Sequence, residues 1–192
     1  MNKSTLLQMI LLAFLAALLT AACTGTGKRS SDNTVAAYEA ALDTHAGQTA
    51  AIDSGLEAFR RTYADFTAER FIDRVGDLYA ERFYFNDTLH TFTRRAELVD
   101  YMRRTAAGLS SSRITVHQVI TEKTDVFVRW TMQFTTRVAG RDITSDSIGM
   151  SHLRFDEHGR IVLHQDYWDS GHALYAHLPI VGFFVRRARS SM

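Results

Sequence analysis

The sequence contains one cysteine and one proline among 192 residues, and its charges are almost balanced. A single cysteine cannot form an intramolecular disulfide, so the fold has to be stabilised by its core. With 22 basic and 21 acidic side chains, there is no excess positive charge to neutralise phosphates, which argues against nucleic acid as a partner. A glycine-rich phosphate loop and a Cys/His cluster are also missing, so the sequence predicts no cofactor and no metal site.

One long hydrophobic run is present, and it lies near the N-terminus. Lys3 precedes an apolar stretch from Leu6 to Leu19, and small residues lead from it into Cys23. This layout is typical of a secretory signal peptide, here residues 1–22, and the run is short for a membrane span. Cys23 lies where a bacterial lipoprotein signal places its lipidated cysteine, although Thr20 replaces the usual aliphatic residue.

We therefore expect an exported, lipid-anchored protein on the periplasmic side of a bacterial membrane. Ordinary cleavage after residue 22 and an uncleaved anchor are the alternatives. Residues 23–53 are rich in small and polar side chains, which predicts a flexible tether, with a weak helix as an alternative near residues 35–42. Residues 54–171 are predicted to form one folded domain.

The C-terminal segment, residues 172–192, has the pattern of an amphipathic basic helix. Phe183 and Phe184 lie beside three arginines near the end of the chain. Such a helix can rest on an anionic membrane surface, or it can cover the open end of the folded domain and leave its arginines in solvent. The sequence alone leaves both interpretations open.

The hydrophobic pattern of the domain changes from helical to strand-like along the chain. Apolar residues recur at helical spacing in residues 56–66, 71–79 and 96–102, with Thr67 and Thr93 as predicted N-caps of the second and third helices and a first strand at 82–86 between them. After Gly108 the period becomes two, which predicts strands at 113–121, 125–138, 142–155 and 160–169. Short turns make these strands antiparallel neighbours, so the sequence predicts an α+β domain with one sheet curled around the helices.

The last predicted strand carries polar side chains where a core strand would carry aliphatic ones. Side chains alternate along a strand, so His164, Asp166 and Trp168 share one face. Small residues alternate on the strand before it, which is typical of a strongly curved sheet around a hollow. We expect these faces to line a cavity for an apolar small molecule, with ligand contacts from Trp168, His164, Ser151 and Ser147.

Three segments carry a resemblance to a known fold. They are LYAERFYFNDTLH (78–90), TRRAELVDYM (93–102) and RFDEHGRIVLHQDYW (154–168), and the last is the most specific. The order of elements and these segments resemble the cone-shaped nuclear transport factor 2-like fold, in particular its SnoaL-like and ketosteroid-isomerase-like branches, over about residues 56–169. Because this fold carries isomerases, cyclases, hydrolases, dehydratases and binding modules, the resemblance implies the architecture more strongly than the activity.

The resemblance also implies three candidate catalytic residues. Asp87 resembles the carboxylate base of the isomerases, and Tyr63 resembles the phenol that donates a hydrogen bond to the developing oxyanion. Asp166 resembles the last-strand carboxylate that SnoaL-like cyclases use as a base. The protonated aspartate of the isomerases is absent, and Ser151 stands in its place, so steroid isomerisation is not expected.

Each candidate also has a purely structural interpretation. Asp87 belongs to an Asn-Asp-Thr turn and can hold that loop, and Tyr63 can be a core tyrosine with a hydrogen-bonded hydroxyl. Asp166 can be a buried acid paired with His164 or an arginine. Because the isomerase set is incomplete, a ligand-binding or unassigned role is favoured, with an acid-base enzyme acting on a small carbonyl-bearing or polycyclic substrate as the alternative. Apolar Ile148 and Met150 indicate either core packing or a homodimer face.

Overall fold

A computed structural model describes residues 34–138, 140–177 and 181–191. The predicted signal peptide, Cys23 and the first part of the predicted tether lie outside these residues. The chain divides into two units after Ala37, and the fold below is that of the second unit, which begins at Tyr38. In the described part of the chain, no helix has both the length and the apolar character needed to cross a membrane.

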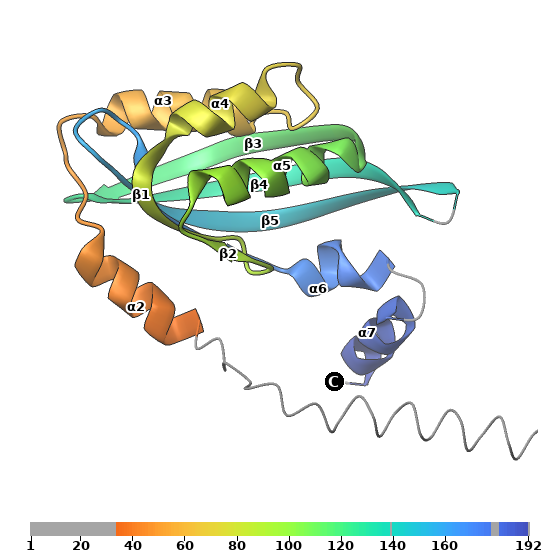
Figure 1. Ribbon diagram of the computed structural model, residues 1–192. Helices are drawn as coiled ribbons and strands as arrows, with labels where there is room; N and C mark the ends of the chain where they lie inside the picture. Colours follow the sequence, from red (N-terminus) through yellow and green to blue (C-terminus); the bar gives the residue numbers. More distant parts are fainter. Residues whose placement is uncertain (1–33, 139, 178–180, 192) are drawn as a thin grey trace, which may run out of the picture. The chain divides into compact units, whose positions relative to one another are not determined.

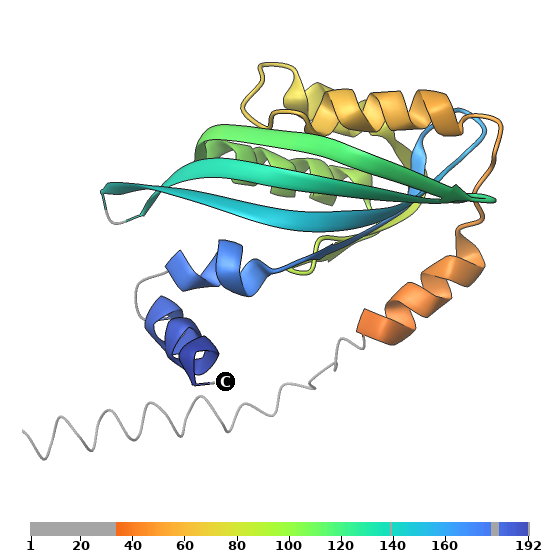
Figure 2. The same ribbon diagram turned by 180° about the vertical axis from the view of Figure 1, so that it is seen from behind.

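A six-stranded sheet forms the framework of this unit. Its long strands are drawn as arrows in Figure 1. Its strands are β1 (Tyr79–Asn86), β2 (Thr91–Phe92), β3 (Leu109–Glu122), β4 (Asp125–Val138), β5 (Arg141–Phe155) and β6 (Ile161–Trp168), in the order β2-β1-β6-β5-β4-β3. The predicted meander of β3 to β6 is antiparallel throughout, whereas β1 and β6 are parallel. The long strands are visibly curved when seen from behind (Figure 2).

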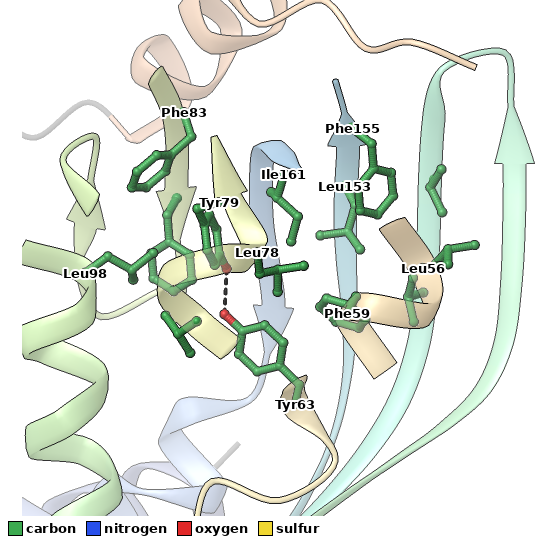
Figure 3. Close-up of a cluster of buried hydrophobic side chains, with 14 of the residues drawn as sticks. Leu56, Phe59, Tyr63, Leu78, Tyr79, Phe83, Leu98, Leu153, Phe155 and Ile161 are labelled. Carbon is green, nitrogen blue, oxygen red and sulfur yellow. Dashed lines mark hydrogen bonds between the residues drawn. The ribbon is translucent and has the colours of Figure 1, made fainter. Parts of the chain in front are cut away.

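Three helices, α3 (Ile52–Tyr63), α4 (Phe71–Leu78) and α5 (Arg95–Ala107), contribute to one core with the sheet. In α3 the buried residues Ile52, Leu56, Phe59 and Tyr63 recur every three or four positions, which turns one stripe of the helix toward the strands. Figure 3 shows Leu56 and Phe59 of this helix beside Leu153 and Phe155 of β5. The α+β prediction is confirmed, including the helices that precede the meander.

A β-bulge in β6 decides which side chains of that strand face the helices. Phe155 pairs with Ile161 and Arg154 pairs with Leu163, so Val162 has no partner in the register. Ile161 therefore belongs to the main core, while Leu163 packs on the opposite face of the sheet. Beyond the bulge the alternation continues, and His164 faces the helices again.

The helix α2 (Thr34–Thr44) lies within the residues predicted as a tether. From Tyr38 onward it packs on the outer face of the sheet, where Ala41 is buried beside Tyr84 and Leu163. The Arg154 side chain donates hydrogen bonds to the carbonyl oxygens of Leu42 and His45 just beyond it. The structure therefore places packed residues inside the range 23–53.

The element boundaries differ from the sequence predictions at several points. Thr67 does not cap α4, because its amide and hydroxyl both donate to Asp65 in the preceding turn, and the helix begins four residues later. Thr93 does not cap α5 either, since Arg94 is the N-cap residue there. The C-terminal segment is interrupted rather than continuous: it forms α6 (Ser170–Ala173), the 3₁₀ turn η1 (Tyr175–His177) and α7 (Val181–Ser190).

Candidate functional site

A cavity of about 190 Å³ lies between α3, α5 and the inner face of the sheet. Most of its wall is aromatic or aliphatic, with contributions from Phe59, Phe85, Trp130, Met132, Trp168 and Leu174. Leu174 follows α6, so the segment after β6 helps to enclose the space. A smaller polar part of the wall holds Tyr63, Asp87, Ser151, His164 and Asp166.

The polar part contains a chain of hydrogen bonds that begins at Tyr63. The hydroxyls of Tyr63 and Tyr79 are 2.5 Å apart, and Figure 3 shows them pointing toward each other from α3 and β1. The Tyr79 hydroxyl is 2.6 Å from Nδ1 of His164, and Nε2 of the same ring is 2.9 Å from Oδ1 of Asp166. His164 is therefore bonded at both nitrogens, and its side chain is only 2% exposed.

The chain continues from Asp166 to the neighbouring strands. The Ser151 hydroxyl donates to Oδ1 of Asp166 at 2.5 Å, and Nε1 of Trp130 donates to the Ser151 oxygen at 2.9 Å. A glycine at position 149 makes this arrangement possible, because a Cβ atom there would lie 2.2 Å from the Trp130 ring. The absence of a side chain at this position of β5 thus leaves room for the Trp130 ring, whose indole nitrogen reaches Ser151.

Asp87 occupies the loop after β1, where its carboxylate holds the loop and also belongs to the cavity wall. Its Oδ1 accepts hydrogen bonds from the backbone amides of Leu89 and His90, which fixes the loop. Its Oδ2 accepts the Tyr101 hydroxyl at 2.5 Å, and its side chain also lines the cavity. The Trp168 indole donates to the Asp87 carbonyl oxygen at 2.7 Å, which anchors the last strand to this loop.

Burial keeps the tyrosines of this site protonated. Desolvation raises the pKa of Tyr63, Tyr79 and Tyr101 well above the ordinary value of 10, and the nearby carboxylates of Asp87 and Asp166 add to the shift. Each phenol therefore remains a hydroxyl that can donate one hydrogen bond. A phenolate base is not available at this site near neutral pH.

Six of the seven catalytic and ligand-binding residues predicted from the sequence meet at this cavity. They are Tyr63, Asp87, Ser151, His164, Asp166 and Trp168. Ser147 is the exception: it lines a separate surface depression with Ile148, and its buried hydroxyl has no hydrogen-bond partner within the described residues. It is paired across the sheet with Met132, and the larger side chain of that residue lines the cavity instead.

Three polar or aromatic members of the site, Tyr79, Trp130 and Tyr101, were not predicted. Helical spacing in the sequence places Tyr79 on the apolar side of a helix, although β1 begins at this residue. Trp130 could have been found, because Val126, Val128 and Trp130 alternate along β4 as one buried face. Across the described residues, there is no cluster of three or more His, Cys, Asp or Glu side chains arranged to hold a metal ion.

Comparison with known proteins supports the architecture. Residues 59–164 match the family model described as a SnoaL-like domain. No curated protein matches the chain by sequence.

Several solved structures share this fold at low sequence identity. A hypothetical protein with a ketosteroid isomerase-like fold from Catenulispora acidiphila, solved in complex with trimethylamine, is 19% identical with a TM-score of 0.54, over 65% of this chain and 93% of that one. A SnoaL-like polyketide cyclase from Jannaschia sp. is 10% identical with a TM-score of 0.53, over 65% and 91% of the two chains. One from Shewanella putrefaciens is 14% identical with a TM-score of 0.54, over 62% and 92%. At these identities the likeness shows the fold alone, and both cyclase assignments are themselves provisional.

Proposed function

This chain belongs to the SnoaL-like domain family, and we propose that it binds one small, largely apolar molecule in the cavity between the helices and the sheet. The distribution of polar groups in the wall supports this proposal, because they gather around Asp166 and Asp87 while the remainder is hydrocarbon. Ligand sites are usually concave, mostly apolar and equipped with a few placed polar groups. Since an apolar cavity of roughly 150 Å³ accommodates benzene, this one suits a substituted ring.

Mass spectrometry of the purified mature protein tests the proposal. We expect a small molecule to be released on denaturation of the wild type. Met132→Trp places a large ring in the cavity and should abolish the copurifying species, whereas Gln133→Trp adds the same ring to an exposed position on the same strand and should retain it. Equal loading of both variants would count against the cavity as the binding site.

An acid-base activity is the second candidate function, and a different observation favours it. The Asp166 side chain is 16% exposed, lines the cavity and is backed by the buried His164, which is the arrangement of a proton acceptor with an orienting partner. Exchange of the α-protons of cyclohexanone in D₂O, followed by proton NMR, tests for such a base. An acceleration by the wild type that is lost in Asp166→Asn would support catalysis, and equal rates for both would leave a binding role only.

We further propose that the protein acts at the periplasmic side of a bacterial membrane, anchored through a lipid on Cys23. The apolar run before this cysteine supports the proposal. Metabolic labelling with a radioactive fatty acid tests it, since label should enter the wild type and not Cys23→Ser. The exposed rings of Phe183 and Phe184 support a second contact of α7 with the membrane, which is expected to weaken in the double variant Phe183→Ser/Phe184→Ser.

A homodimer is a further proposed partner. Ile148 is 70% exposed on the outer face of β5, beside the half-buried Met150. An apolar side chain of this size at the middle of a sheet face supports a self-association surface. Sedimentation analysis should give a dimer for the wild type and a monomer for Ile148→Glu.

A further inference from the structure

The hydrogen bonds around the cavity converge on Asp166, from Trp130 on one side and from Tyr63 on the other. The Trp130 indole is a donor only, so the Ser151 oxygen must accept from it. The Ser151 hydroxyl in turn donates a hydrogen bond to Asp166. A carboxylate at Asp166 can only accept, so Nε2 of His164 must carry the proton that lies between them.

The same logic continues to the far end of the chain. A neutral imidazole protonated at Nε2 has a lone pair at Nδ1, which accepts the Tyr79 hydroxyl. The Tyr79 oxygen then accepts a hydrogen bond from the Tyr63 hydroxyl. Tyr63 lines the cavity, yet its proton is directed into the protein, and it presents only lone pairs to a ligand. This is the reverse of the oxyanion donor that the sequence resemblance implied.

The hydrogen-bond donors on the other side of the cavity also have acceptors within the protein. The Tyr101 hydroxyl donates to Asp87, and the Thr105 hydroxyl is hydrogen-bonded to Tyr101. The Trp168 indole donates to a backbone oxygen. Two carboxylates, Asp87 and Asp166, belong to the wall, and among the described residues that line it there is no Lys or Arg. The cavity therefore offers acceptors and negative charge.

We propose that the ligand of this cavity is a small organic ammonium ion, a protonated amine with apolar substituents. This inference rests on the proposed binding function and specifies its ligand class. The N–H groups of such an ion match the acceptors of Tyr63 and the carboxylates, and its charge compensates theirs in a site of low dielectric. The rings of Trp130 and Trp168 add faces on which a cation is favoured. A carbonyl or carboxylate ligand would meet lone pairs only.

Four probes that share one ring test the ligand class by isothermal titration calorimetry on the mature protein. They are cyclohexylammonium, cyclohexanol, cyclohexanone and cyclohexanecarboxylate. We expect affinity to fall in that order, with cyclohexylammonium bound at least about tenfold more tightly than cyclohexanone, because hydrogen bonds to a charged group are the stronger kind. Tighter binding of the ketone or the carboxylate would overturn the ammonium proposal while leaving a binding function, and binding of none would overturn both.

Variants locate the preference within the cavity. Asp166→Asn and Asp87→Asn should each reduce the advantage of cyclohexylammonium over cyclohexanol at least about threefold. Asp146→Asn removes the same charge from an exposed position on β5 and should leave the ratio unchanged. Equal effects of all three variants would point to the overall charge of the protein and would contradict a site in the cavity.

The direction of the hydrogen-bond chain has its own test, which needs no ligand. In ¹⁵N NMR of histidine-labelled protein near neutral pH, His164 should be the Nε2–H tautomer, assigned by its loss in His164→Asn. Tyr79 acts as a positioning residue: Tyr79→Phe frees the Tyr63 proton for the cavity and should raise cyclohexanone affinity about fivefold. Tyr38→Phe removes a hydroxyl on the other face of the sheet and should not. An Nδ1–H tautomer, or unchanged ketone affinity in Tyr79→Phe, would overturn the assigned direction.

Discussion

The two faces of the sheet carry the same three side-chain types in the same order. On the inner face, Tyr79, His164 and Asp166 are joined through both nitrogens of the imidazole. On the outer face, Tyr38 lies 2.7 Å from Nδ1 of His152, and Nε2 of that ring lies 2.6 Å from Oδ1 of Asp125. The two histidines come from adjacent strands.

The two Tyr-His-Asp sets differ in what balances the charge of the carboxylate. Asp125 accepts two hydrogen bonds from the Arg154 guanidinium, and the same arginine binds the backbone at the end of α2. Asp166 has no arginine among its described partners, and it lines a cavity. One set of residues thus holds a helix on the sheet, whereas the other leaves negative charge facing a space of ligand size. Residue types alone do not distinguish these roles.

Removing Arg154 should have the largest effect on stability. Arg154→Leu leaves Asp125 with His152 alone and strips two backbone carbonyls of their donors, so we expect a loss of about 3 kcal/mol in the free energy of unfolding. Urea denaturation measures it. Arg129→Leu, at an exposed position on β4, is the matched control and should change stability by less than about 0.5 kcal/mol. Similar losses of stability in both variants would contradict the structural role assigned to Arg154 and its partners on the outer face.

Removing one tyrosine hydroxyl from each Tyr-His-Asp set tests how burial affects the contribution of that hydroxyl to stability. Tyr79 is fully buried, so Tyr79→Phe leaves Tyr63 and His164 without a partner and should lower stability by about 2 kcal/mol. Tyr38 is partly exposed, and water can replace its hydroxyl in Tyr38→Phe, for which we expect about 1 kcal/mol or less. Thermal and urea unfolding of the pair provide the measurement, and the reverse order would contradict the burial argument.

The sequence was sufficient for the fold and for one half of the site. Period-two alternation located all four strands of the meander, and it put His164, Asp166 and Trp168 on the correct common face. It could not show that a bulge at Val162 separates Ile161 from that alternation. Valine is an ordinary strand residue, so nothing in the sequence marks this bulge. The result for the polar face was correct since all three residues follow the bulge.

Partners distant in sequence were beyond reach. Asp166 was expected to pair with His164 or an arginine, and the structure selects the histidine. Its continuation to Tyr79 spans 85 residues between the two side chains, and only the parallel pairing of β1 with β6 brings them together. Alternation gives the face of a side chain but not its neighbour across the sheet, so the partners of His164 and the directions of its hydrogen bonds cannot be derived from the sequence.

Acid should weaken the hydrogen-bonded set of Tyr38, His152 and Asp125 on the outer face of the sheet. Burial lowers the pKa of His152 below its ordinary 6.5, although Asp125 opposes the shift, and burial together with Arg154 lowers that of His45. The folded state then binds fewer protons than the unfolded state below about pH 6.5, so stability is complete above this pH and declines as pH falls. The free energy of unfolding should decrease from pH 7.5 to 5.5, and by less in His152→Gln. An identical decrease in the variant would exclude His152 as its source.

Two serines on the inner face of β5 give the smallest expected effects and the finest comparison. Ser151 accepts from Trp130 and donates to Asp166, so Ser151→Ala should lower stability by about 1 kcal/mol. Ser147 lies four residues earlier on the same strand, and its buried hydroxyl makes no hydrogen bond to a described residue. Removing an unsatisfied hydroxyl relieves a desolvation penalty, so Ser147→Ala should be neutral or stabilising by up to about 0.5 kcal/mol. If calorimetry gave equal losses for the two, Ser147 would belong to the polar site after all.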